Sequence, residues 1–301
     1  MRIRLKAEVA ALAAMLLITS GAVASETSQV VQTQHLTVSG APSVVSSARL
    51  QELAGQAEQT LEQILQTWQI SAKVERFGKI KLEFRRPLND TTRTSIFFWS
   101  QDEGRRVRIV RVFGAQGQPY GLAHKLTHAV FPSRDKLIRN MMGIYSENRF
   151  GSRKSFPMCG HNNDLWVQAL ISLGSYIPLT SLGPDHGDWG MEFRGQKPFV
   201  SDRARQHAAY VESGSFGEYL IKTHGINRMK RLCRLARDGG RAWQEVYGLS
   251  LKKLEAAWLE QLKASRQANS KEVAALMDLI KDNPRTACQR ARGLVVGGTK
   301  H

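Results

Sequence analysis

Two histidines four positions apart carry the strongest chemical signal in this chain of 301 residues. In His124-Lys125-Leu126-Thr127-His128, a helix would place both imidazoles on one face, where they can bind a single metal ion. A hydrolytic zinc site also needs a third protein ligand and an acceptor for the proton of the metal-bound water. Lys125 cannot be that acceptor, because its ammonium is protonated at neutral pH and repels a nearby dication. The pentapeptide therefore predicts a metal-binding scaffold whose hydrolytic base is missing.

Strand patterns precede the pentapeptide, and helical patterns surround and follow it. We expect strands at 34–38, 79–84, 94–99 and 106–113, and a helix over 44–69 with apolar residues at three- and four-residue steps. Further helices are expected at 121–130, 135–148, 163–172, 201–223, 226–237, 241–246, 251–264, 271–281 and 285–292. The stretch 176–200 is rich in Gly, Pro and Asp, and we expect a surface loop near the site there. This order predicts an α+β fold: a small N-terminal sheet with a flanking helix, then a mostly helical half.

The first 24 residues have the composition of an export signal. A basic start, an apolar core over 9–18 and the small residues Ala22-Val23-Ala24 predict cleavage after Ala24. We therefore expect a secreted or periplasmic protein with no membrane span after cleavage. The expected organisation is a signal peptide at 1–24, an extended lead-in at 25–43, a main domain at 44–266 and a C-terminal helical tail at 267–301.

Three cysteines fit an oxidising compartment. In an exported protein, Cys159, Cys233 and Cys288 predict one disulfide and one free thiol. The sequence leaves all three pairings open.

The chain is strongly basic, with a formal net charge of +17. Such a charge favours anionic surroundings and makes an anionic envelope polymer a candidate partner. The basic residues cluster in two places: Arg105, Arg106, Arg108 and Arg111, and Arg228, Lys230, Arg231, Arg234 and Arg237. Neither cluster is accompanied by the aromatic-and-basic module of a nucleic-acid binder, so nucleic acid is not an expected partner.

Four segments, taken together, resemble the gluzincin-type zinc peptidases, specifically the peptidase MA-like domains of bacteria. GLAHKLTHAV at 121–130 is similar to the active-site helix of that family, whose usual form is H-E-L-T-H. RNMMGIYSE at 139–147 stands where the family has W-x-x-E-G-x-A-x-Y, of which only Gly143 is kept. SFGEYL at 215–220 resembles S-F-x-x-Y-L, and 247–258 resembles the ending F-G-x-S-x-x-x-L-x-x-x-W. The likeness covers 34–262 and implies a zincin-like fold.

The resemblance implies a degenerate active site. His124 and His128 match the first two zinc ligands, Lys125 stands at the general base, and Met142 stands at the third ligand, a glutamate in the family. A thioether suits softer ions than zinc. Glu147 lies five residues beyond Met142, about 140° around the helix, and should face elsewhere. We expect the best replacement ligands in the loop at 185–186 (Asp185-His186), with His161 as another loop candidate.

These features lead us to expect an exported, catalytically inactive protein that keeps the peptidase framework and has a binding or structural role, with a peptide or protein as a candidate ligand. We expect no resident cofactor, with zinc on His124 and His128 as the alternative. Two other functions stay open: a metal-dependent peptidase whose ligand and base have moved, and a basic envelope module that holds an anionic polymer. Chelator-sensitive cleavage would mark the first, and salt-dependent binding the second.

Overall fold

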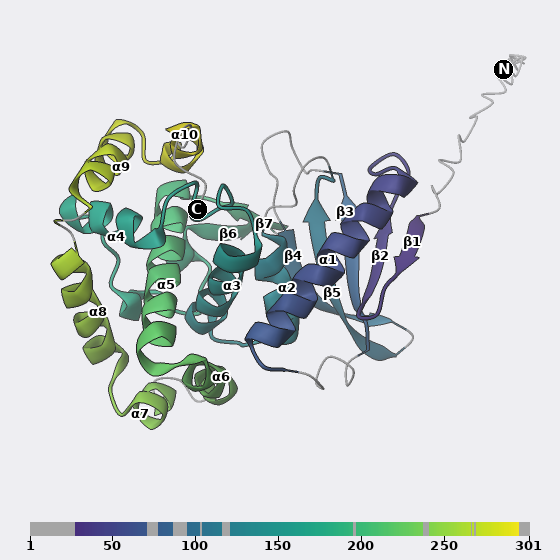
Figure 1. Cartoon of the computed structure of the whole chain (residues 1–301), viewed down its shortest axis with the longest axis horizontal. Coiled ribbons are helices and arrows are strands. Elements are labelled where there is room, and N and C mark those ends of the chain that lie inside the picture. The colour runs from purple at the N-terminus through teal and green to yellow at the C-terminus, as the bar shows by residue number, and fades with distance from the viewer. Residues whose placement is uncertain are drawn as a thin grey trace, which may run out of the picture.

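The computed structural model describes residues 28–70, 78–86, 95–102, 104–115, 121–194, 197–236, 241–265, 267 and 269–294. The export signal predicted at 1–24 lies outside the described residues, as does the end of the predicted tail. The described chain forms a sheet with one long covering helix and, beside it, a mostly helical half (Figure 1). The α+β arrangement predicted from the sequence is confirmed.

In the described residues, the main sheet has the strand order β1-β2-β3-β5-β4. The strands are β1 (Gln29–Gln32), β2 (Leu36–Gly40), β3 (Ile80–Arg85), β4 (Ser95–Asp102) and β5 (Arg105–Phe113). β2, β3 and β5 run parallel, and β1 and β4 add antiparallel edges. Alternate residues of β2 and β3 are buried, as expected of strands with one covered face.

Helix α1 (Ser47–Thr67) crosses one face of this sheet (Figure 1). It begins at Ser46, whose hydroxyl accepts a hydrogen bond from the backbone of Arg49, a normal N-cap. Its apolar stripe is buried: Leu50, Leu53, Ala54, Ala57, Leu61, Ile64 and Leu65. α1 connects the parallel strands β2 and β3, which need such a crossover, and so brings the chain back to the sheet ahead of the histidine helix.

The helical half begins with that helix. Its elements are α2 (Leu122–Val130), α3 (Lys136–Phe150), α4 (Asn163–Ser172), α5 (Arg203–His224), α6 (Ile226–Leu235), α7 (Arg241–Tyr247), α8 (Leu251–Ser265), α9 (Ser270–Asp282) and α10 (Ala287–Leu294). α3 packs against both α2 and α5. Two glycines of α5 permit the close contact with α3: a Cβ at Gly217 would lie 2.8 Å from that of Met141, and one at Gly214 would lie 2.6 Å from Ile144.

The expectation of an irregular loop at 176–200 is wrong in its second half. Short 3-10 turns at Leu179–Ser181 and Gly187–Trp189 lead into a hairpin of β6 (Met191–Arg194) and β7 (Lys197–Val200). Strands of four residues are too short for a clear alternation of apolar and polar residues, so the sequence pattern did not separate them from a loop.

The predicted outer segments pack into the body. β1 and β2, in the predicted lead-in, belong to the main sheet. α9, in the predicted tail, packs on α4, and a disulfide joins Cys288 of α10 to Cys159, just before α4. The structure thereby selects one of the three pairings that the sequence left open, with Cys233 as the free thiol. A search of the described residues finds no helix that is long and apolar enough to cross a membrane.

Candidate functional site

Charged residues from neighbouring elements hold the histidine helix α2 at both ends. Gly121 begins the helix with a positive φ of 74° and has no side chain to cap it. The carboxylate of Glu147 on α3 caps it instead, accepting hydrogen bonds from the backbone nitrogens of Gly121 and His124, each at 3.1 Å. At the other end, Arg108 of β5 donates to the carbonyl of Ala129 at 3.3 Å. Both charges complement the helix dipole.

The two histidines lie side by side on α2. Their ring centroids are 4.4 Å apart, and the side chains are 4% and 5% exposed. His128 Nε2 donates to the carbonyl of Arg139 at 3.1 Å and so carries a proton in this tautomer. Burial, with the charges of Lys125 and Arg139, lowers the pKa of each imidazole well below 6.5. Both rings are therefore neutral at pH 7.

Gly143 is the reason that α3 can lie against the imidazole of His124. A Cβ at this glycine would stand 2.6 Å from His124 Cδ2, closer than real side chains approach. On the other side, Tyr210 of α5 stacks on the same ring, with centroids 6.1 Å apart and an interplanar angle of 24°. The orientation of His124 is thus set by close packing from two helices.

The position expected for a third metal ligand contributes to the hydrophobic core. Met142 is 1% exposed and packs among apolar side chains. In the described part of the chain, no His, Cys, Asp or Glu joins His124 and His128 in a group of three whose ligand atoms all lie within 4.8 Å of one another. Glu147 contacts the backbone of α2 rather than the imidazoles. The pair therefore lacks a third protein ligand among the described residues.

Cations surround the pair. Burial and the charge of Arg139 lower the pKa of the half-buried Lys125 to about 7. Burial and the same guanidinium lower the pKa of Lys136, on the first turn of α3, to about 8. The pKa of Arg139 is lowered by burial as well. With a pKa of about 7, Lys125 is about half protonated at neutral pH, rather than fully protonated as the sequence led us to expect. Arg139 and the protonated fraction of the lysines oppose a dication near the histidines.

The loop candidates lie beside α3. Lys136 and Arg139 affect the pKa of His186, which is lowered mainly by burial. The charge of Asp185 raises the pKa of Lys136 in part. Trp189 of the same loop lies against Lys136, whose ammonium is 5.3 Å from the ring centroid. The segment Asp185-His186 thus reaches the cations, and neither residue joins the two histidines in a ligand group of the described chain.

His161 is placed away from α2. Its ring lies 6.1 Å from that of Trp166 on α4, and its pKa is lowered by burial and raised in part by a hydrogen bond with the backbone of Ala291 on α10. This candidate therefore belongs to the contact between α4 and α10.

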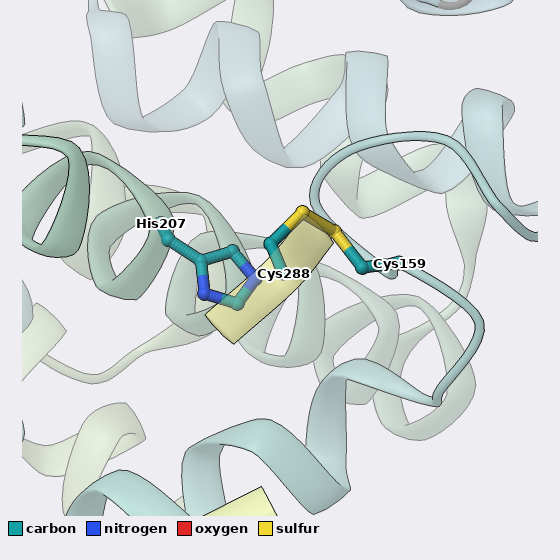
Figure 2. A group of neighbouring side chains, drawn as sticks. All are labelled: Cys159, His207 and Cys288. Carbon is teal, nitrogen blue, oxygen red and sulfur yellow. A yellow bond between two sulfur atoms is a disulfide. The ribbon is translucent and has the colours of Figure 1, made fainter. Parts of the chain in front are cut away.

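Two other groups of potential ligands are explained by structural contacts. His207 lies beside the disulfide of Cys159 and Cys288 (Figure 2), where both sulfur atoms are already bonded. His207 Nε2 donates to the carbonyl of Pro157 at 2.9 Å. In the second group, Glu58 accepts hydrogen bonds from His35 and Thr33 and ties the β1–β2 turn to α1; Glu62 completes the group.

The basic cluster predicted on β5 is not a single surface. Arg108 is 2% exposed and points inward, whereas Arg106 lies over the ring of Trp99 at 4.5 Å. Arg111 lies over Phe98 at 5.0 Å and pairs with Glu83 at 2.8 Å. In contrast, three arginines of α6 are exposed: Arg228, Arg231 and Arg234.

The sequence patterns did not identify Lys136, Arg139 and Asn140 as site residues. Their only signal is their spacing, since polar residues at one, four and five along a buried helix share one face. Comparison with known proteins adds nothing to this geometry: no protein-family model, curated protein or solved structure matches the chain.

Proposed function

We propose that this protein is an exported, non-catalytic binding protein on a framework similar to that of the gluzincin peptidases. The observation that carries the proposal is the absence, among the described residues, of a third donor beside His124 and His128, whereas two cations, Lys125 and Arg139, act on both imidazoles. Zinc hydrolases need three protein ligands, an open position for water and a base. Lys125 stands where that base would be, and Glu147 is engaged in capping α2.

Metal content tests the loss of hydrolytic chemistry. Mature protein produced with zinc available should contain far less than one zinc per chain by elemental analysis, and His128→Ala should not change that content. Stoichiometric zinc that is lost in His128→Ala would contradict the proposal. Chelator-sensitive cleavage of a peptide library would then support the alternative of a peptidase with relocated groups.

Restoring the lost groups tests the likeness to a peptidase. Lys125→Glu together with Met142→Glu returns the base and the third ligand of the family to the helix pair. If the framework is peptidase-like, this double variant should take up zinc that depends on His124 and His128, provided that circular dichroism shows it to be folded. A folded variant that takes up no zinc would count against the family resemblance.

Export is supported by the composition of residues 1–24 and by the disulfide between Cys159 and Cys288. Fractionation of a bacterial host should place the protein outside the cytoplasm, with a new N-terminus at Ser25. Protein that stays in the cytoplasmic fraction and still begins at Met1 would contradict this part of the proposal.

The exposed arginines of α6 favour a second function, the binding of an anionic polymer. Within the described part of the chain, Arg231 is the only one of the three that forms a salt bridge, with Glu245 at 3.1 Å. Retention on a heparin column that falls steeply with salt and weakens in Arg228→Ala with Arg234→Ala would support this function. Retention that is indifferent to salt would exclude it.

A further inference from the structure

Several buried nitrogens around α2 and α3 have no hydrogen-bond partner in the described protein. They are His124 Nε2, Lys136 Nζ, Arg139 Nε and Asn140 Nδ2. His124, Lys136 and Asn140 are 4%, 5% and 2% exposed, so bulk water does not solvate their polar atoms freely. Buried polar groups nearly always have a partner, and an orphaned group points to something that completes the site.

These nitrogens belong to one cluster. The side chain of Asn140 hydrogen-bonds to the imidazole of His124 and raises the pKa of His124 in part, whereas the atoms Asn140 Nδ2 and His124 Nε2 have no partner in the described structure. Arg139 acts on the pKa of His124, of Lys125 and of Lys136. We call Lys125, Lys136, Arg139, His124 and Asn140 the α2–α3 cation cluster.

The cluster has an excess of positive charge. None of the salt bridges found among the described residues includes Lys125, Lys136 or Arg139. The charge of Glu147 raises the pKa of Lys125 in part, but this carboxylate already accepts two backbone hydrogen bonds from α2. The carboxylate of Asp135 caps α3 by accepting a hydrogen bond from the backbone nitrogen of Ile138 at 2.9 Å.

The remaining acids come from the loop that covers α3. Asp185 and Asp188 act on Lys136, but both lie beyond salt-bridge distance of its ammonium in the described structure. Trp189 supplies a ring face to the same ammonium. A ring face stabilises a cation without satisfying its hydrogen-bond donors. The donors of Lys136 therefore remain available to a ligand.

We propose that the α2–α3 cation cluster binds the phosphate group of an anionic ligand. Its polar groups are two lysine side chains, a guanidinium, an amide and a neutral imidazole, and charge-assisted hydrogen bonds from the protonated lysines and the guanidinium to phosphate oxygens are strong. Two negative charges on the ligand would offset most of the excess positive charge, whereas a metal dication would increase it.

Two members of the cluster and two of its neighbours reach the protein surface in part. Lys125, Arg139, Tyr210 and His186 all retain partial exposure, whereas Lys136 and Asn140 are enclosed. A phosphate entering between them would contact Lys125 and Arg139 first and reach the enclosed donors afterwards.

The proposal rests on the proposed function in one respect, that no metal occupies His124 and His128. The test is isothermal titration of the mature protein with inorganic phosphate at constant ionic strength. We expect saturable binding at one site, weakened by at least about tenfold in Lys136→Met, because a charge-assisted contact is lost. Lys252→Met, which removes the same charge from the exposed surface of α8, should bind as the wild type does.

A second variant keeps the test informative if Lys136→Met does not fold. Asn140→Asp preserves the shape of the side chain and places a carboxylate among the cations. We expect this variant to melt at a higher temperature than the wild type without phosphate and to gain no further stability from phosphate. The melting temperature of the wild type should rise as phosphate is added.

Several results would overturn the proposal: no phosphate binding by the wild type, equal binding by the Lys136→Met and Lys252→Met variants, or a preference for acetate over phosphate. Zinc content, measured on the same samples, separates the two claims. Stoichiometric zinc would refute the proposed function, whereas absence of both zinc and phosphate binding would refute only the phosphate site. Tighter binding of a phosphomonoester than of free phosphate would identify an ester as the ligand class, with the same donors engaged.

Discussion

At the scale of single residues, one buried carboxylate organises the histidine helix. Glu147 is fully buried and its pKa is raised by burial. Its carboxylate accepts hydrogen bonds from two backbone nitrogens at the start of α2. Hydrogen bonds from helix N–H groups stabilise a carboxylate in the same way as a side-chain N-cap does, and here the cap comes from another helix. Glu147 therefore has a structural role, as the cap of α2.

Replacing Glu147 by Gln should lower the free energy of unfolding by roughly 1–3 kcal/mol, because the amide turns one donor toward the N–H groups of α2. Urea denaturation followed by tryptophan fluorescence measures the change. Glu245→Gln removes an exposed carboxylate that pairs with Arg231, and it should cost no more than about 1 kcal/mol. Equal stability of the two variants would contradict the capping role.

A second residue, His207, should make stability depend on pH. Burial lowers its pKa from 6.5 to about 4 in the folded protein. The unfolded chain therefore binds the proton more tightly, so stability falls as pH drops below 6.5 and the loss is complete below about 4. The full loss from this group is roughly 3 kcal/mol.

His207→Gln isolates this contribution, because Gln keeps a donor for the carbonyl of Pro157 and does not titrate. Between pH 7 and pH 4.5, the wild type should lose more unfolding free energy than the variant does. Parallel curves for the two proteins over this interval would show that the folded pKa of His207 is close to that of the unfolded chain.

At the scale of elements, the contact between α2 and α3 depends on a glycine. Gly143 lies against the His124 ring, and a methyl group there would overlap the imidazole. The helices can respond only by moving apart or by turning the ring, and both disturb the α2–α3 cation cluster. The single position retained from the W-x-x-E-G-x-A-x-Y pattern thus has a packing reason.

Gly143→Ala should destabilise the protein by about 1–3 kcal/mol through overpacking. Gly55→Ala is the matched control, since its Cβ would meet nothing within 4 Å on the exposed side of α1. That control should instead stabilise the protein by roughly 0.5–1 kcal/mol, the usual gain of alanine over glycine in a helix. Thermal unfolding of both variants gives the comparison, and a neutral Gly143→Ala would mean that α3 can retreat without cost.

At the scale of the whole molecule, a covalent link holds the C-terminal helices to the body. The disulfide of Cys159 and Cys288 closes a loop with a sequence separation of 129 residues. α10 is a short helix with two buried residues, Ala287 and Ala291, so packing alone holds it weakly.

Cys288→Ser should lower stability by about 2–4 kcal/mol and expose the chain after α9 to trypsin. Cleavage at Arg285 or Arg290, followed by mass spectrometry, reports the release. Cys233→Ser serves as the control for loss of a thiol, and its cleavage pattern should match that of the wild type. Resistance of Cys288→Ser to trypsin would show that α9 and α10 stay packed without the bond.

Local sequence patterns predicted the order and type of most elements. Apolar spacing in α1 and the alternation in β3 repeat along the chain, and such periodic patterns are local properties that need no tertiary contact. The same holds for the chemistry of His124, Lys125 and His128, since a helix places residues four apart on one face whatever surrounds it. The hairpin of β6 and β7 was not predicted from the sequence, because its strands are too short to show a periodic pattern.

The surroundings of the histidines depend on contacts between elements, which local patterns do not specify. Three kinds of contact join residues from different elements. They are the disulfide of Cys159, the capping of α2 by Glu147, and the packing of Lys136, Arg139 and Asn140 of α3 near α2. Their distances depend on how helices pack, and helix packing is set by contacts such as that of Gly143 with His124 rather than by local spacing. For this reason the sequence predicted a metal pair, whereas the folded chain surrounds that pair with cations and unpartnered donors suited to an anion.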